Sequence, residues 1–375
     1  MTVCTTTPEE STPTAMVNRK AFLALLRKAV AVASRSAYSN RADVAFRTID
    51  GVLGVYGTGN NAAFCGVMPC GQNVAPCVAG GRSLLADVTA DRSILYDLAE
   101  LTAPAHRAKG RPYLSVPTQV VTFSAVPGET MLGVVRGVVR GAAETSRYAI
   151  NGVLLESGAD GARLVAMNGR CLGVFETRQP RGAPEVSVVL PARMLMLAGK
   201  WLGKKSGTIR VERTTGTGRI SIHGPDWSLC SYEVEGSFPN YRDVIPLDDG
   251  MCWQADRVKL IAALKLVSKV CDPDARVVRL DFAQYTLRLS ATGKAGEHGE
   301  SPDTASDTSV VCPAGKVEQC DLAIGFNPLF LLDALRSIPG DRVEISATAS
   351  NHPCMIYGTD TKAIRWLIMP ITITV

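Results

Sequence analysis

Histidines, cysteines and short glycine-rich segments are where this chain of 375 residues could carry catalytic chemistry. Its four histidines, His106, His223, His298 and His352, lie in loop or strand contexts with no nucleophile or carboxylate motif beside them. The segment Gly57-Thr58-Gly59 is too short for a phosphate-binding loop, and a hairpin turn is its better interpretation. Catalysis needs a nucleophile with its base, paired carboxylates or metal ligands. We therefore expect no enzymatic activity.

The 11 cysteines follow no metal-site spacing. No Cys-x-x-Cys pair occurs, and Cys65 and Cys70 have no histidine nearby. This pattern indicates reduced thiols packed as small apolar residues, as in cytoplasmic proteins, with no metal and no cofactor. Residues 1–16 are rich in Thr, Pro and Glu and lack the basic start and apolar run of a signal peptide, so a disordered tail is expected there. No apolar run is long enough to span a bilayer, so we expect a cytoplasmic protein without a membrane partner.

Size and charge leave several classes of partner open. A chain of this length is expected to form two or three domains, and 46% hydrophobic residues supply several cores. With 40 basic and 35 acidic residues the net charge is only +5, which argues against an obligate polycation. Nucleic-acid binding is still possible, because it needs one basic face and not a basic total.

Basic residues recur at helical spacing along the chain. Residues 18–35 place apolar side chains on one stripe and basic ones, including Arg35, on the other side. Arg136 and Arg140 are four apart in a second predicted helix, and Lys265 and Lys269 are four apart in a third, predicted over 253–271. A helix with one basic side is most often simply solvated. Three such helices in register favour a shared role.

These helices mark a repeat with the period of a whole domain. They begin near residues 18, 128 and 254, and each is followed by strands and then by a strand-to-helix step near 90, 191 or 327. In the first copy we predict a strand over 83–88 and a helix over 90–101. Three α+β domains of one plan are the simplest interpretation. If these domains curve into an arc, their basic helix faces can line one concave surface, which suits a phosphate backbone and reads no base sequence.

The stretch 146–174 carries the most specific motif. It reads as a strand opening with Arg147-Tyr148-Ala149-Ile150-Asn151-Gly152, a Gly-rich turn, and a second strand ended by Asn168-Gly169 before Cys171-Leu172. This block resembles the middle domain of bacterial sliding clamps, the β subunit of the replicative DNA polymerase. Further landmarks follow in the family's order: 235–241 (EGSFPNY) before 244–246 (VIP), 324–327 (IGFN) before 331–335 (LLDAL), and 368–371 (IMPI).

The resemblance covers residues 120–375 well and 17–117 only loosely. It implies an α+β fold of three repeated DNA-clamp domains, with helices on one face of antiparallel sheets, forming half of a ring. The corresponding domains are 17–117 (divergent), 118–250 and 251–375, after the tail 1–16. The resemblance also implies a homodimer that encircles duplex DNA independently of sequence. It implies a hydrophobic pocket between the second and third domains, where short linear motifs of the DNA polymerase and the clamp loader dock.

Carried over residue by residue, the family's peptide pocket maps onto Ile150, Met167, Gly169, Arg170, Cys171, Leu172, Pro239, Val244, Asn327, Phe330, Pro353, Leu367, Met369, Pro370 and Ile371. Without the family, most of these residues would read as ordinary core and loop. The predicted DNA-facing residues are Arg35, Arg136, Arg140, Arg147, Tyr148, Arg193, Lys265 and Lys269.

This sequence departs from the family at the predicted pocket. Cys171 stands where the family has Arg, with Arg170 one place earlier, and Asp243 stands where Arg is common. These changes alter the charge at the rim and therefore the peptide preference. A clamp paralogue or mobile-element clamp that serves a repair or specialised polymerase is the alternative to the replicative clamp.

Overall fold

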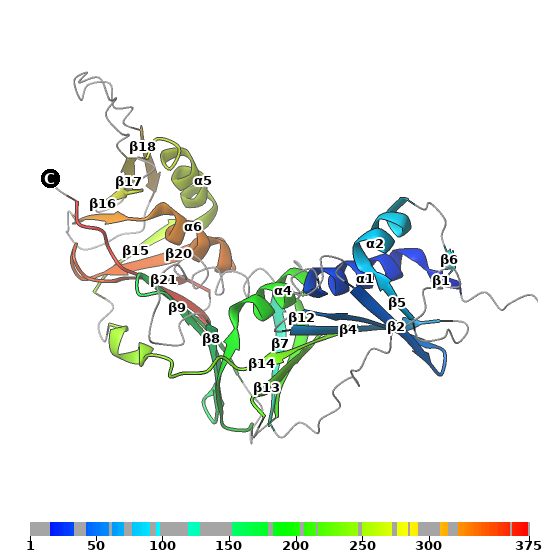
Figure 1. Cartoon of the computed structure of the whole chain (residues 1–375). Helices are drawn as coiled ribbons and strands as arrows, with labels where there is room; N and C mark the ends of the chain where they lie inside the picture. Colours follow the sequence, from blue (N-terminus) through cyan, green and yellow to red (C-terminus); the bar gives the residue numbers. More distant parts are fainter. Residues whose placement is uncertain are drawn as a thin grey trace, which may run out of the picture. The chain divides into compact units, whose positions relative to one another are not determined.

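The fold combines antiparallel sheets with a few helices (Figure 1). The computed structural model describes residues 16–33, 43–59, 62–70, 77–90, 95–97, 119–127, 152–178, 183–202, 206–214, 217–246, 250–271, 276–283, 286–291, 308–313, 322–360 and 362–373. The expected α+β class is thereby confirmed. The chain forms two compact units, one of residues 1–118 and 212–232 and the other of residues 119–211 and 233–375. The division into three domains stays a prediction.

The first unit is built on a sheet with the strand order β5-β2-β3-β4-β14-β13. Its elements are β1 (Met16–Asn18), α1 (Arg19–Ala33), β2 (Asp43–Ile49), β3 (Val52–Thr58), β4 (Ala62–Pro69), β5 (Cys77–Gly80), α2 (Gly81–Ala90), β6 (Leu95–Asp97), β13 (Arg219–His223) and β14 (Trp227–Tyr232). The pairing of β4 with β14 joins segments that lie more than 150 residues apart in sequence, with Trp227 opposite Gly66 and Ser231 opposite Ala62.

Helix α1 forms as its sequence predicts. Asn18 caps it, since its side-chain oxygen accepts a hydrogen bond from the Ala21 N–H at 3.0 Å. Phe22, Leu26 and Ala29 are fully buried, and the helix packs on β3 and β4. The backbones approach closely there, because a Cβ atom at Gly57 would lie only 2.3 Å from the Ala29 carbonyl oxygen. Glycine is therefore required at this position of β3.

The second unit holds one long sheet and one short sheet. The long sheet has the order β11-β8-β9-β10-β22-β21-β20-β15, and the short one has the order β18-β17-β16-β19. Their strands are β8 (Gly152–Gly158), β9 (Gly161–Met167), β10 (Cys171–Thr177), β11 (Val186–Pro191), β15 (Met251–Asp256), β16 (Val278–Phe282), β17 (Thr286–Ala291), β18 (Thr308–Pro313), β19 (Leu322–Phe326), β20 (Arg342–Ala347), β21 (Cys354–Gly358) and β22 (Ile364–Ile368). The unit also contains β7 (Gln119–Pro127), α4 (Ala192–Leu202), α5 (Arg257–Val267) and α6 (Pro328–Ser337), while β12 (Ser206–Thr214) runs from one unit into the other.

One strand order occurs three times along the chain. In β5-β2-β3-β4, in β11-β8-β9-β10 and in β19-β16-β17-β18, three consecutive strands form a meander and the fourth returns beside the first. This is the order of a Greek key. In each case the fourth strand leads directly into a helix, which is α2, α4 or α6. The repeat inferred from sequence patterns is therefore present in the connectivity of the strands.

Two predicted elements of the first copy are wrong. Residues 83–88 belong to helix α2 instead of a strand. Leu84 and Val88 are its buried hydrophobic side chains, four apart, which is helical spacing. The helix predicted over 90–101 is also wrong, because α2 ends at Ala90 and residues 95–97 form strand β6.

The helix predicted from residue 253 begins four residues later. Residues 251–256 form strand β15, in which Trp253 and Ala255 are buried and alternate with less buried neighbours. Asp256 then caps α5, accepting a hydrogen bond from the Lys259 N–H at 2.9 Å. In the sequence, the alternation of buried and less buried residues in this strand could not be distinguished from the apolar pattern of α5, which follows it directly.

Candidate functional site

The candidate site lies where β10 meets β22 in the long sheet of the second unit. These strands pair antiparallel, with Leu172 opposite Leu367. Beyond the end of β22, the Met369 N–H still donates to the Arg170 carbonyl at 2.8 Å, so the pairing continues past the strand. Trp366 points to the opposite face, where its indole N–H donates to Ser337 of α6 at 2.7 Å. Leu172 and Leu367 therefore lie on the face turned away from α6, which we call the cluster face.

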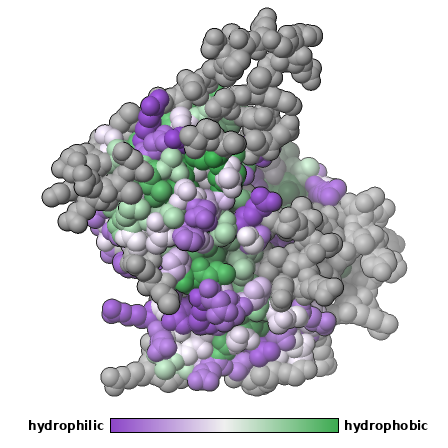
Figure 2. Space-filling model, turned by 90° about the vertical axis from the view of Figure 1, so that its left-hand side faces the viewer, coloured by the Kyte–Doolittle hydropathy of each residue, from purple (hydrophilic) through white to green (hydrophobic). Residues whose placement is uncertain are grey.

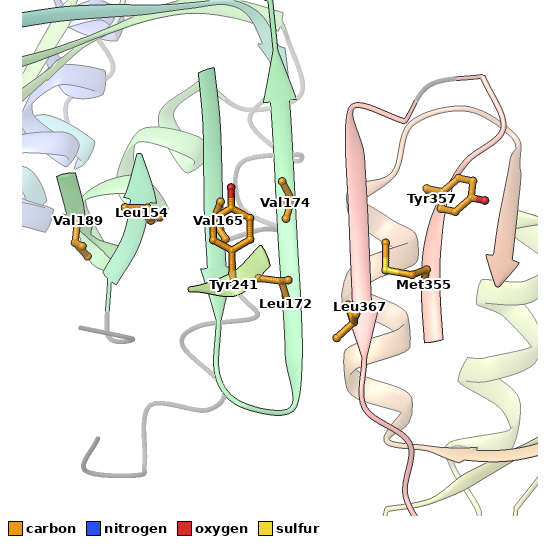
Figure 3. Close-up of a cluster of buried hydrophobic side chains, with 9 residues drawn as sticks. All are labelled: Leu154, Val165, Leu172, Val174, Val189, Tyr241, Met355, Tyr357 and Leu367. Carbon is orange, nitrogen blue, oxygen red and sulfur yellow. The ribbon is translucent and has the colours of Figure 1, made fainter. Parts of the chain in front are cut away.

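An apolar cluster covers the cluster face around this junction. Its buried members are Leu154, Val165, Leu172, Val174, Val189, Tyr241, Met355, Tyr357 and Leu367 (Figure 3). Met167, Val234, Phe238 and Ile245 pack against it and remain partly exposed. Two border segments flank the cluster, residues 369–371 after β22 and residues 239–244. Met369 on the first is 40% exposed and Val244 on the second is 44% exposed, so both add apolar surface. In the space-filling view, hydrophobic patches reach the surface between hydrophilic residues (Figure 2).

A rigid turn connects β9 to β10 at the end of the cluster. The Asn168 side-chain oxygen accepts hydrogen bonds from the N–H groups of Arg170 at 3.0 Å and Cys171 at 2.9 Å. Gly169 has a φ of 78°, a conformation that favours glycine. Asn168 is buried, whereas Gly169 and Arg170 are exposed. The turn thus presents the Arg170 side chain to solvent from a fixed backbone.

The border segment 239–244 contains the 3-10 helix Tyr241–Val244, which hydrogen bonds to one carboxylate hold in place. Glu156 accepts hydrogen bonds from the Tyr241 hydroxyl at 2.7 Å and from Arg242 at 2.8 Å. Burial and the Glu156 hydrogen bond raise the pKa of Tyr241 to about 12. The Arg242 guanidinium also stacks over the Tyr241 ring, 4.7 Å from its centroid. These contacts fix the position of the neighbouring Val244.

A row of charged side chains crosses the β9-β10-β22 part of this face. Glu176 accepts from Arg163 and from Arg365, each at 2.7 Å. Glu176 and Arg365 are 189 residues apart in sequence, so this pair ties the two halves of the sheet together. The hydrogen bond to Glu176 raises the pKa of the Arg163 guanidinium. The charges of this row are thereby paired with one another.

The structure brings most of the predicted pocket residues to this junction. Leu172 and Leu367 belong to the cluster, and Met167 packs against it. Gly169, Arg170 and Cys171 form the turn, although Cys171 is buried and its side chain bonds to Asn168. The predicted residues of the border segments are Pro239, Val244, Met369, Pro370 and Ile371.

Three other predicted pocket residues lie at or in α6 and just before β21. Asn327 caps α6, accepting from the Leu329 N–H at 3.0 Å, and Phe330 is buried in that helix. Pro353 is half-buried just before β21. Ile150 lies outside the described residues. Sequence reasoning missed Met355, Glu156 and Tyr241 as parts of this site, although Tyr241 ends the motif EGSFPNY that signalled the segment.

The predicted DNA-facing residues are described only in part. Lys265 in α5 and Lys269 just after it are exposed, and Arg193 is half-buried at the start of α4. Arg35, Arg136, Arg140, Arg147 and Tyr148 lie outside the described residues. Within the described segments, no group of three or more His, Cys, Asp or Glu side chains could hold a metal ion. In that same part of the chain, no helix is long and apolar enough to cross a membrane.

Comparison with known proteins assigns the family. Residues 242–372 match the family model described as DNA polymerase III beta subunit, C-terminal domain. The chain is 26% identical over 280 residues to the beta sliding clamp of Streptomyces coelicolor, covering 72% of each protein. Residues 242–372 therefore belong to the DNA polymerase III β subunit family, and the chain as a whole is similar to bacterial β sliding clamps.

Two further similarities concern other parts of the chain. A beta sliding clamp homolog of Streptomyces muensis, GriR, is 30% identical over 201 residues, and the chain spans half of its length. The crystal structure of the sliding clamp of Bartonella birtlesii bound to griselimycin superimposes with a TM-score of 0.78 at 19% identity, covering 96% of this chain and 100% of that one. This structural match establishes that the clamp fold extends over nearly the whole sequence, including the part matched only loosely by motifs.

Proposed function

We propose that this protein is a DNA sliding clamp, a non-catalytic processivity factor that encircles duplex DNA as a ring of two copies. The observation that carries the proposal is the threefold strand order and the way its copies are joined. The meander ending in β4 is extended by β14, and the meander ending in β10 is extended by β22. Both junctions are antiparallel and comprise five register pairs each.

The third meander supports a head-to-tail dimer. It ends in β18, which among the described strands pairs only with β17. By analogy with β4 and β10, this strand would be extended by the last strand of a further domain. The second domain supplies β14 to the first and the third supplies β22 to the second, so the first domain, residues 17–117, of a second copy of the chain would extend β18. Two copies joined in this way close a ring of six domains.

Light scattering during gel filtration tests the ring. We expect a particle of twice the chain mass of 39.9 kDa at micromolar concentration. A monomer at that concentration would contradict the proposal. Because bacterial chromosomal DNA lies in the cytoplasm, we place the activity there.

The second part of the proposal is topological tethering to DNA. Exposed Lys265 and Lys269 and half-buried Arg193 supply positive charge for phosphates without a pattern for reading bases. We expect clamps loaded by the clamp loader to stay on circular duplex and to be lost from the same DNA after linearisation. Equal loss from both forms would exclude tethering by encirclement.

The third part is docking of the DNA polymerase and the clamp loader on the cluster face. Exposed Met369 and Val244 beside a buried apolar cluster suit the apolar anchors of a short peptide. We expect Met369→Ala to weaken binding of a polymerase clamp-binding peptide at least tenfold, measured by fluorescence anisotropy. Leu266→Ala on α5, where the leucine is 49% exposed, is the matched control and should bind as the wild type does. Unchanged binding by Met369→Ala would contradict this site.

The alternative partner is a repair or specialised polymerase served by a clamp paralogue. Cys171 is buried and Asp243 is exposed at positions where this sequence departs from the family pattern, so the surface offered to a peptide differs. Competition between peptides from a replicative and a repair polymerase distinguishes the two assignments. Tighter binding of the repair peptide would favour the paralogue.

A further inference from the structure

After β22 the chain passes from the long sheet of the second unit to the short one. The Met369 N–H donates to the Arg170 carbonyl at 2.8 Å, which continues the pairing of β22 with β10. Two residues later, the Ile371 N–H donates to the Gly325 carbonyl of β19 at 2.7 Å, and the two residues form an antiparallel bridge. Among the described strands β19 pairs only with β16, so this bridge lies at its other edge. Residues 369–371 are therefore held by both sheets.

The close approach of this segment requires glycine at position 325. A Cβ atom there would lie 2.7 Å from the Ile371 carbonyl oxygen and 2.7 Å from the Cγ2 atom of Ile373. These distances are too short for a Cβ atom, so the segment would have to move away. The neighbours in β19, Ile324 and Phe326, are fully buried on the opposite face of the strand. An added methyl group would therefore press on the segment and leave that core in place.

The backbone of β19 does not itself require glycine there. Gly325 does not have a positive φ, so a residue with a side chain can adopt its conformation. Glycine in the interior of a strand lowers its stability and often marks the close approach of another backbone. The contact with Ile371 and Ile373 therefore explains why this position of the strand has no side chain.

The anchor on Gly325 limits the freedom of Met369. Only Pro370 separates the two hydrogen-bonded residues, and its ring restricts φ to about −65°. The backbone of Met369 is thus fixed on both sides, while its side chain is 40% exposed at the border of the apolar cluster. A side chain on a fixed backbone needs less ordering when a ligand binds, so more of its contact energy contributes to affinity.

We propose that Gly325 is a positioning residue of the cluster face. It lies in the short sheet and acts through Met369: by leaving space for residues 371–373 on β19, it keeps the Met369 side chain where a ligand of the cluster face contacts it. The inference rests on the docking function proposed above. It gives β19, which contributes no residue to the apolar cluster, a role in a site built on the long sheet.

Gly325→Ala in the full-length protein tests the anchor without any ligand. Hydrogen exchange of residues 369–373, measured by mass spectrometry, should become about tenfold faster, while β16 and β17 exchange as in the wild type. Gly158→Ala is the matched control, because the nearest atom to a Cβ at this strand glycine, Cγ of Glu185, is 4.0 Å away. Ile371→Pro is a second variant in case the alanine does not fold. It removes the same hydrogen bond without adding an atom to β19 and should also speed the exchange of the Met369 N–H.

Peptide binding tests whether the anchor acts through Met369. The probe is a fluorescent peptide with the clamp-binding sequence of a replicative DNA polymerase, followed by anisotropy. Gly325→Ala should weaken its binding about three- to tenfold, and Gly158→Ala should bind as the wild type does. In a Met369→Ala background the same Gly325→Ala change should weaken binding less than about twofold, because the side chain that it positions is already absent.

The other outcomes separate the inference from the docking function. Unchanged exchange of residues 369–373 in Gly325→Ala would overturn the inference, because β19 would then not anchor the segment. Faster exchange with wild-type binding, or a binding loss that adds fully to that of Met369→Ala, would overturn it as well. In each of these cases the docking function stands if Met369→Ala alone weakens binding. If the peptide does not bind the wild-type protein, the docking function and the inference both fall.

Discussion

The free edge of β18 gives the sharpest test of the proposed ring. Backbone groups of a strand point alternately to its two neighbours. In β10, Glu176 bonds toward β22, donating its N–H to the Ala363 carbonyl at 2.7 Å, and the register partner of Glu176 in β9 is Arg163. Arg163 lies on the face away from the helices. The equivalent position in β18 is Val311, the partner of exposed Arg288 in β17. The N–H of Val311 should therefore point to the open edge.

Replacing Val311 by proline removes this donor and leaves the bonds to β17 in place. A lost backbone hydrogen bond costs about 1 kcal/mol, and a proline ring that disturbs the approaching strand brings the cost to about 1–2 kcal/mol. A ring of two copies contains the junction twice, so the dimer loses about 2–4 kcal/mol. Since a factor of ten in a dissociation constant corresponds to about 1.4 kcal/mol, the dissociation constant of the dimer should rise about 30- to 700-fold.

Sedimentation velocity over a concentration series measures this change. Val311→Ala keeps the N–H at the same position, so it should remain dimeric and serves as the matched control. Far-ultraviolet circular dichroism should show that Val311→Pro retains its secondary structure. A dimer dissociation constant unchanged by the proline would refute the assignment of β18 as the dimer edge, whatever the mass of the wild-type particle.

Three further predictions concern the cluster face and the basic helix. Tyr241→Phe should lower the free energy of unfolding by about 1 kcal/mol at pH 8, because the hydrogen bond to Glu156 is lost. Since the pKa of Tyr241 is raised from 10.0 to about 12 in the folded state, this stability difference is complete below pH 10 and should shrink toward pH 12. A difference in urea unfolding that stays constant up to pH 11.5 would contradict the Glu156 contact. Asn168→Ala leaves two backbone N–H groups of the turn without their acceptor and should lower stability by about 1–2 kcal/mol in urea unfolding, whereas Asn168→Asp should retain most of it. Lys265→Gln and Lys269→Gln should each lower the slope of log affinity for duplex DNA against log salt by about 1, and unchanged slopes would remove these residues from the DNA-facing surface.

The local sequence was sufficient to predict helices whose caps and apolar stripes lie within the helix itself. The apolar stripe over residues 18–35 predicted α1, and the strand-to-helix step near residue 327 predicted α6. Caps and periodicity act within one or two turns, so they can be read directly from the chain. The same reasoning failed at residues 83–88, where helical packing of Leu84 and Val88 prevailed over an apparent strand.

The motif around residues 146–174 and its companions indicated the clamp family, and with it the fold class. These motifs named most residues of the junction, including Leu172, Leu367 and Met369. They omitted Met355 and Glu156, whose roles come from strands and contacts that no motif marks. A resemblance supplies the residues that a family shares, whereas the supporting contacts belong to the individual chain.

The sequence by itself determined the repeated α+β pattern and the apolar residues available for a core. Only the tertiary structure decided that β10 pairs with β22, which aligns Arg170 with Met369 and brings Glu176 to Arg365. Many apolar strands in this chain have the same period of two, so their sequences do not specify which partner they choose. That choice depends on the simultaneous burial of both sheet faces and on ion pairs formed across the junction, which exist only once the whole unit has folded.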